Sequence, residues 1–413
     1  MSNVKNSAVS YSRISTIIVV VVCGFTSGLP LSLTASTLQA WLSEFDSVSL
    51  TAIGALSLVG LPYTLKWLWA PCLDRFLPSA IGRRRGWMII AQLGITLGLL
   101  GMSLGSEPYW YGIVFFAFFV AFMSATQDIA SDAYRIDLLD TKDYGVGATA
   151  VQYGYRLAMI VSGGFAIIMS DLIGWAWTYR SMAALMMMNA WFTYKMPEPF
   201  VSYARPKSIS SAYWGPIRHF LSRHACMLWL ALVILYKFTD AFGLSLNTVF
   251  LLRGLAYSKL EVGASMKMTS IFGALLGSAG AAVAMQRWSL YRCLWVFGLL
   301  QGIAHLGFAY HAWIGGHHLY LMISVVFLEF FMSGMGSVAF VALLMRLCHK
   351  RFAAAQFALL TSVASLGRVF TGYFAGSFAE AYGWVAFYML AVVVALPSLA
   401  LLYALREDKI FKN

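Results

Sequence analysis

Charged residues are scarce in this chain, and acidic residues are the scarcest of them. Only 11% of the 413 residues are charged, with 17 Asp and Glu against 29 Lys and Arg. An ordinary soluble domain carries roughly 25% charged residues. Hydrophobic residues make up 60% of the chain. This composition excludes a soluble globular protein and is typical of a protein that crosses a lipid bilayer several times.

Cysteine and catalytic motifs are also sparse, and their absence excludes several kinds of site. The five cysteines show no metal-ligand or disulfide spacing, so we expect them to be small buried apolar residues. The histidines form no metal-binding pattern, and no nucleophile elbow, phosphate loop or zinc-helix motif is present in a plausible context. We therefore expect no metal, no cofactor and no enzymatic activity. These absences disfavour the alternative of a membrane enzyme or sensor without net transport.

Long apolar runs are abundant instead. A membrane helix needs about 20 mostly apolar residues, and cutting the sequence at polar or Gly/Pro-rich joints predicts twelve such spans. They lie at 14–42, 50–73, 86–105, 110–137, 146–170, 175–195, 224–251, 260–285, 291–310, 319–347, 353–380 and 384–405. The sequence therefore predicts an all-α integral membrane protein.

The net charge of +12 follows a membrane topology and does not indicate a nucleic-acid partner. Basic residues gather in alternate loops, such as 83–85 between the second and third spans and the central loop up to Arg223. The opposite loops carry acids such as Glu44 and Asp171. Lys and Arg are enriched in the cytoplasmic loops of membrane proteins. We therefore expect both termini to face the cytoplasm.

An internal repeat divides the chain into two halves. The segment that starts at Tyr153 parallels the segment that starts at Leu366, so that Gly174-Trp175 matches Gly383-Trp384 about half a chain later. We expect a six-helix bundle at 1–196, a cytoplasmic linker at 197–223 and a second six-helix bundle at 224–413. Such a duplication is typical of a two-bundle, alternating-access transporter with the major facilitator fold, whose binding site lies at the midplane between the halves.

One joint contains an acid beside several arginines. The stretch APCLDRFLPSAIGRRRGW at 70–87 resembles the cytoplasmic signature of the major facilitator superfamily. In that family an acid and a basic cluster hold the bundles closed on the inner side. The resemblance implies gating roles for Asp74, Arg75, Arg83, Arg84 and Arg85. The alternative is that the arginines only follow the topology rule.

The N-terminal half further resembles the AmpG-type muropeptide permeases of bacteria. The stretches that carry this resemblance are GFTSGLPLSLTASTLQAWL, IGALSLVGLPYTLKWLWAPCLDRF, GRRRGW, SATQDIASDAYRIDLL and GYRLAMIVSGG. The resemblance implies import of anhydro-muropeptides from the periplasm across the bacterial inner membrane, driven by protons and needing no cofactor. We expect a monomer in the lipid bilayer. A carrier of acetyl-coenzyme A or another anionic metabolite on the same fold is the alternative.

Two carboxylates lie in the fourth predicted span. Asp128, Asp132 and Arg135 are spaced at i, i+4 and i+7, so they share one helix face. Charged residues in membrane helices generally face the bundle interior or a water-filled cavity. We predict that Asp128 carries the proton and that Asp132 modulates it, or instead that Asp132 only pairs with Arg135 or another cation. Asp137 and Asp140 lie nearer the loop, and we expect both to be solvated.

Further polar residues within the spans are candidates for cargo binding. Muropeptides carry peptide carboxylates that a cation would bind, and sugar rings that aromatic and amide side chains would contact. For Lys66 the alternative is extension of its amine towards the membrane surface. Lys237 and Asp240, at i and i+3, could pair only with each other. The predicted cargo-binding residues are Gln39, Tyr63, Lys66, Gln127, Tyr134, Lys237, Asp240 and Lys267.

Overall fold

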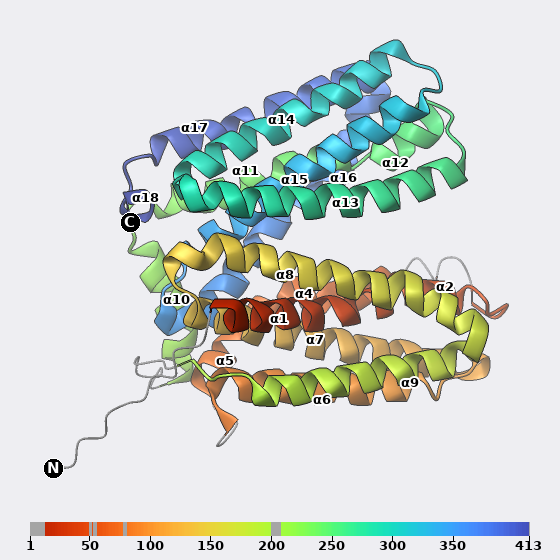
Figure 1. The fold of residues 1–413 in the computed structure, drawn as a ribbon, viewed down its shortest axis with the longest axis vertical. Coiled ribbons are helices and arrows are strands. Elements are labelled where there is room, and N and C mark those ends of the chain that lie inside the picture. The colour runs from red at the N-terminus through yellow and green to blue at the C-terminus, as the bar shows by residue number, and fades with distance from the viewer. Residues whose placement is uncertain (1–12, 49–51, 53–55, 77–80, 200–207, 413) are drawn as a thin grey trace.

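The chain forms two helical bundles lying side by side, joined by a helix on the surface (Figure 1). The computed structural model describes residues 13–48, 52, 56–76, 81–199 and 208–412, and this part of the chain contains helices without strands. The prediction of an all-α protein is therefore confirmed. The linker helix α10 (Ile209–Leu221) begins at a capping box in which Ser208 and Ser211 exchange hydrogen bonds.

The N-terminal bundle is built from the elements that precede α10. They are α1 (Arg13–Leu33), α2 (Ser36–Leu42), η1 (Leu56–Gly60), α4 (Leu61–Leu65), η2 (Lys66–Leu68), α5 (Ala70–Arg75), α6 (Arg83–Met102), η4 (Glu107–Tyr109), α7 (Trp110–Leu138), η5 (Thr141–Asp143), α8 (Tyr144–Met159), the π-helix η6 (Ile160–Phe165) and α9 (Ala166–Lys195).

The C-terminal bundle follows α10. Its elements are α11 (Cys226–Leu244), α12 (Asn247–Val249), the π-helix η7 (Phe250–Gly254), α13 (Lys259–Arg287), α14 (Leu290–Ile314), α15 (Leu319–Leu347), η8 (Lys350–Phe352), α16 (Ala353–Val394), α17 (Leu396–Ala404) and α18 (Lys409–Lys412).

Helix length accounts for the expected spans. In the described residues nine helices are long and apolar enough to cross a membrane, and one of them runs over 55 residues from Thr141 to Lys195. At about 1.5 Å per residue this is far longer than the roughly 30 Å hydrocarbon core, so it crosses twice. The 42-residue α16 likewise joins two spans at a non-helical glycine. With the second span, which is broken, the described helices accommodate the twelve predicted crossings.

The second span differs from the continuous helix expected at 50–73. Between residues 56 and 75 the chain forms four short pieces, η1, α4, η2 and α5. Pro62 and Pro71 stand in the first turns of α4 and α5, where the missing N–H of proline is tolerated but cannot continue a preceding helix. The break places Lys66 at a joint between helical pieces.

Two glycine corners have the same backbone shape in the two halves. Gly174 has φ 79° and ψ 158°, and Gly383 has φ 79° and ψ 172°, a region that essentially only glycine occupies. One turn beyond each corner a tyrosine is buried: the Tyr179 hydroxyl donates to the Leu33 carbonyl, and the Tyr388 hydroxyl donates to Asn247 Oδ1, both at 2.9 Å. The corners occupy the positions that the predicted repeat pairs with each other.

We expect Gly174→Ala and Gly383→Ala each to lower the free energy of unfolding by about 1–3 kcal/mol, because a Cβ is strained at this backbone geometry. Neither glycine has an atom within 4 Å of an added Cβ, so crowding would not contribute. The measurement is the thermal unfolding of the purified protein. Gly112→Ala is the matched control: it lies inside α7 with free space around it, and alanine is favoured there by about 0.5–1 kcal/mol. Equal stability of all three variants would contradict the prediction.

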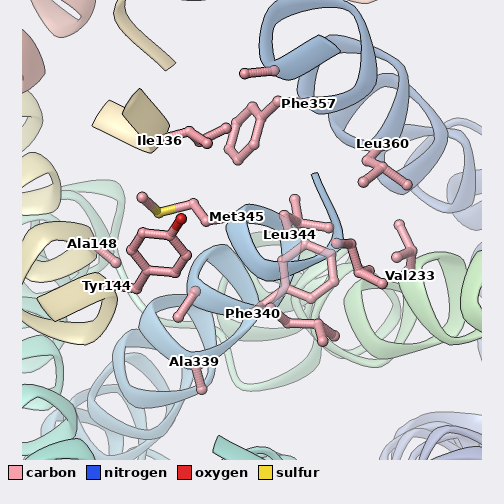
Figure 2. Packing of buried hydrophobic residues seen from close by; sticks show 14 of the residues in the cluster. Ile136, Tyr144, Ala148, Val233, Ala339, Phe340, Leu344, Met345, Phe357 and Leu360 are labelled. Carbon is pink, nitrogen blue, oxygen red and sulfur yellow. The ribbon is translucent and has the colours of Figure 1, made fainter. Parts of the chain in front are cut away.

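The buried apolar residues show how the bundles meet. One core cluster contains residues of both bundles, and Figure 2 shows Ile136 of α7 beside Phe357 of α16, and Tyr144 of α8 beside Met345 of α15. A second cluster draws only on the N-terminal bundle and a third only on the C-terminal bundle. The shared cluster lies at the end where α1 begins and α17 ends, which we call the joined end (Figure 1). Within the described residues, the bundles share no apolar core at the opposite end.

Candidate functional site

A buried acid connects the two bundles at the joined end. Asp74, at the end of α5, is 1% exposed, and its Oδ1 accepts hydrogen bonds from Arg83 Nη2 and Arg84 Nη1, both at 3.0 Å. Its Oδ2 accepts the backbone N–H of Ala355 at 3.0 Å. Ala355 lies in the first turn of α16, where unpaired N–H groups and the helix dipole favour a negative charge. A carboxylate of one bundle therefore caps a helix of the other.

The remaining arginines of the predicted gate contact other groups. Arg75 stacks on the Phe76 ring at 5.5 Å, and no ion pair with Asp74 is seen among the described contacts. Arg85 donates to the Met196 carbonyl at 2.6 Å and lies 3.4 Å from the Glu198 carboxylate. Glu198 also accepts the backbone N–H groups of Arg84 and Arg85, at 2.7 and 3.1 Å, and so caps α6. Sequence analysis missed Glu198, although it is an isolated acid in a basic linker.

Asp137 is buried, which contradicts the expectation that it is solvated. Its side chain is 0% exposed, and Arg84 Nε donates to its Oδ2 at 2.8 Å. Arg84 thus lies between the carboxylates of Asp74 and Asp137, and Arg83 adds the second positive charge. Burial is possible because two acids and two arginines balance one another. Asp140 is 74% exposed, as expected.

The acids of α7 lie deeper in the N-terminal bundle. Asp132 Oδ1 accepts a hydrogen bond from Arg135 Nη2, and its Oδ2 lies 3.8 Å from Lys66 Nζ. The i, i+4, i+7 spacing therefore brings these charges together on one face, and the broken second span supplies Lys66. Asp132 is held between two cations, which is the pairing alternative that the sequence left open.

Asp128 is in a different situation. Its Oδ1 is buried without a hydrogen-bond partner, and no ion pair of Asp128 appears among the described contacts. The Ser27 hydroxyl lies within hydrogen-bonding reach of the carboxylate, and the charges of Lys66 and Arg135 act on it. The hydroxyl groups of Tyr63 and Ser124 are also buried and unpaired beside it. Because an unpaired buried polar group costs about 1–3 kcal/mol, this cluster retains hydrogen-bonding capacity that a proton, water or a ligand would fill.

The other predicted cargo residues of the N-terminal half are distributed unevenly. Gln127 is fully buried, and neither amide atom has a partner. Gln39 lies half-buried in α2. Tyr134 is fully buried, and its hydroxyl donates to the Pro197 carbonyl at 2.7 Å, an arrangement that favours packing of the linker over cargo contact.

In the C-terminal bundle, Lys237 and Asp240 form an ion pair at 3.2 Å on α11. They also bind α15: Lys237 Nζ donates to Ser337 Oγ at 2.8 Å, and Ser333 Oγ donates to Asp240 Oδ2 at 3.1 Å. Asp240 Oδ1 is buried and unpaired. The i, i+4 spacing of the two serines could have indicated this contact. Lys267 lies on α13, but its side chain is outside the described residues.

A cavity of about 820 Å³ opens at the joined end, between η5 and α8 on one side and the α13–α14 joint on the other. None of the site residues predicted from the sequence lines it. In the described residues, no three His, Cys, Asp or Glu side chains come together as a metal site would require.

Comparison with known proteins identifies relatives over nearly the whole chain. The profile of the Major Facilitator Superfamily matches residues 20–371. The anhydromuropeptide permease of Escherichia coli K12 is 42% identical over 393 residues, covering 94% of this chain and 79% of the relative. A putative transporter AmpG 4 of Rickettsia conorii is 29% identical, covering 92% and 94%.

Solved structures show the same fold at low identity. The transporter FucP in the outward conformation matches with a TM-score of 0.70 and 11% identity, over 94% of this chain and 98% of FucP. The proton:xylose symporter XylE matches with a TM-score of 0.67 and 13% identity, over 95% of both chains. At this identity the likeness concerns the fold alone, and it confirms the predicted two-bundle fold.

Proposed function

Because this chain belongs to the major facilitator superfamily, and within it to the AmpG-type permeases, we propose that it imports anhydro-muropeptides into the cytoplasm. The protein is a membrane transporter and not an enzyme. The proposal extends to the driving force, which is the proton gradient, and to the location, which is the bacterial inner membrane with both termini in the cytoplasm. We further propose that it acts as a monomer without a cofactor.

The unpaired Asp128 cluster is the observation that carries the transport mechanism. A carboxylate in a membrane helix is costly, and here it has neither an ion pair nor a full set of hydrogen bonds among the described contacts. Protonation removes that cost and deprotonation restores it. Asp128 would therefore load a proton on one side of the membrane and release it on the other.

The positions of the apolar cores support entry of the proton and the cargo from the periplasm as the first step. With the termini in the cytoplasm, the joined end is the cytoplasmic end, and the bundles share no described core on the periplasmic side. A proton and cargo would then enter from the periplasm. Inward release requires the Asp74–Ala355 contact and the shared core to separate while the bundles rock.

Lys66 is the cation best placed to bind a cargo carboxylate. It is 8% exposed, and its distance of 3.8 Å from Asp132 is long for a charge-assisted hydrogen bond. Asp132 keeps its contact with Arg135 when Lys66 turns to a ligand. A carboxylate of the cargo can therefore bind Lys66 without leaving Asp132 unpaired.

We expect Lys66→Ala to weaken binding of anhydro-muropeptide about tenfold or more, because a hydrogen bond to a charged group contributes about 1.5–3 kcal/mol. The measurement is the Kd of the purified protein by calorimetry. Lys142→Ala is the control, since Lys142 is 78% exposed. An unchanged Kd for Lys66→Ala would remove this residue from the binding site.

The function itself is tested in proteoliposomes. Labelled anhydro-muropeptide should accumulate when the outside is made acidic and should not accumulate after the pH gradient is collapsed. Acetyl-coenzyme A is offered in parallel as the alternative cargo. Accumulation of acetyl-coenzyme A alone, or of neither compound, would contradict the proposed function.

A further inference from the structure

A second buried ionisable pair lies in the C-terminal bundle. His305 Nδ1 of α14 and Glu329 Oε2 of α15 are 3.0 Å apart, and both side chains are 1% exposed. Removing two such groups from water is expensive, and apolar residues of similar volume often stabilise a fold as well or better. Ionisable residues within membrane helices therefore point to a function.

The pair lies next to a row of polar contacts between α11 and α15, formed by Lys237, Asp240, Ser333 and Ser337, which we call the polar seam. Glu329, Ser333 and Ser337 recur every four residues on α15 and so share one face. The two serines bind Asp240 and Lys237 on α11, and their contacts run in antiparallel order along the helices. Glu329 is the next residue of this face beyond Ser333.

Gly243 allows the histidine to reach the seam. It lies three residues beyond Asp240 on α11, and a Cβ added to Gly243 would be 1.7 Å from His305 Nε2. The imidazole therefore rests directly on the α11 backbone. His305 lies within electrostatic reach of Asp240, which joins the pair to the Lys237–Asp240 ion pair.

Two carboxylate oxygens in this region have no hydrogen-bond partner and could bind a proton. Glu329 Oε1 and Asp240 Oδ1 are both buried without a hydrogen-bond partner. The titratable groups that face the His305–Glu329 pair are Asp240 on α11 and Tyr388 on α16. Lys237 lies one helical turn further along α11.

We propose that the His305–Glu329 pair is a second protonation site of the transport cycle and passes its proton to Asp240 through Ser333. The inference rests on the proposed function only in taking protons as the driving ions. Glu329 accepts a proton at its unpaired oxygen. The Ser333 hydroxyl gives its own proton to Asp240 and takes the one from Glu329. Two O–H bonds break and two form, and the net result is the transfer of one proton from Glu329 to Asp240.

The proton transfer would weaken the contact between α11 and α15 in the C-terminal bundle. A neutral Asp240 holds Lys237 less strongly, and the ion pair that links α11 to α15 through the two serines is weakened. Protonation of Glu329, on the periplasmic side of the seam, therefore allows α11 to move relative to α15.

The first experiment needs no cargo. A pH step on the purified protein is followed by infrared difference spectroscopy, which detects the C=O band of a protonated carboxyl. Because Asp128 would give such a band as well, the comparison is made in an Asp128→Asn background, where we expect a buried-carboxyl band that is lost on adding Glu329→Gln and shifted on adding His305→Gln. The matched control, Asp171→Asn, changes an exposed acid on α9 and should keep the band. A band of unchanged size in Asp128→Asn with Glu329→Gln would overturn the proposal.

The second experiment separates coupling from structure in proteoliposomes. We expect Glu329→Gln to lower pH-driven accumulation at least about tenfold while exchange of labelled for unlabelled cargo stays within about twofold. Glu329→Asp, which keeps a titratable group, should retain accumulation with a displaced pH profile, and Ser333→Ala should slow it. Equal loss in Glu329→Asp and Glu329→Gln, or a parent-like Glu329→Gln, would overturn the proposal. If the parent transports no muropeptide, the proposed function fails while the infrared result still decides this inference.

Discussion

Replacing Asp128 with Asn is expected to abolish proton-driven accumulation while cargo still binds and exchanges. Asn has nearly the shape of Asp but cannot carry a proton in and out. Asp128 has no ion pair among the described contacts, and the neighbouring cations Lys66 and Arg135 keep Asp132 as their partner after the substitution. Each proton moved contributes about 2.3 kcal/mol per 100 mV, so losing one coupled proton lowers accumulation about 50-fold at that driving force.

The comparison with two other acids makes this result specific. Asp140→Asn changes an acid that is 74% exposed and should transport as the parent does. Asp132→Asn removes a charge held between Lys66 and Arg135, so we expect lower stability as well as lower transport. Parent-like accumulation in Asp128→Asn would exclude Asp128 as the proton carrier, whatever Asp132→Asn does.

Replacing Asp74 with Ala is expected to open the joined end. The substitution removes the acceptor of Arg83, of Arg84 and of the Ala355 N–H together. Breaking a buried pair of this kind costs about 3–5 kcal/mol, because it leaves charge uncompensated inside the protein. Arg84 retains Asp137, so the largest effect falls on the cap of α16 and hence on the contact between the bundles.

A native thiol reports the opening. Cys348 follows α15 at the joined end and is half-buried, and desolvation raises the pKa of its thiol, which slows alkylation. In Asp74→Ala we expect Cys348 to be alkylated at least about tenfold faster, as a free-energy change above 1.4 kcal/mol implies. Cys226, half-buried at the start of α11, serves as the internal reference, and Asp140→Asn as the control variant. Unchanged labelling of Cys348 relative to Cys226 would show that Asp74 does not hold this end closed.

The features predicted well from the sequence are those set by spacing along one helix. The shared face of Asp128, Asp132 and Arg135 follows from the period of α7 alone, and the structure places the three residues as expected. The sequence repeat pairs the two glycine corners, and both corners have the same backbone geometry. The approach of Arg83 and Arg84 to Asp74 could be expected because the three residues are close in sequence.

Contacts between distant helices were not predictable in the same way. The partner of Asp74 across the bundles is the backbone N–H of Ala355, and the alanine side chain gives no indication of this contact. The burial of Asp137 depends on the direction of Arg84, which is set by packing. The break in the second span did have a local signal, because Pro62 and Pro71 stood in a segment expected to be one helix.

The apolar core that both bundles share among the described residues also affects how the cycle responds to temperature. Opening the joined end exposes surfaces such as Ile136 and Phe357 to water, and exposing apolar surface carries a positive heat-capacity change. The free-energy difference between the two forms will therefore depend on temperature along a curve, as the free energy of protein unfolding does. Cooling weakens the shared core relative to its value at growth temperature, so the balance between outward and inward forms shifts in a cold membrane even when cargo and gradient are constant.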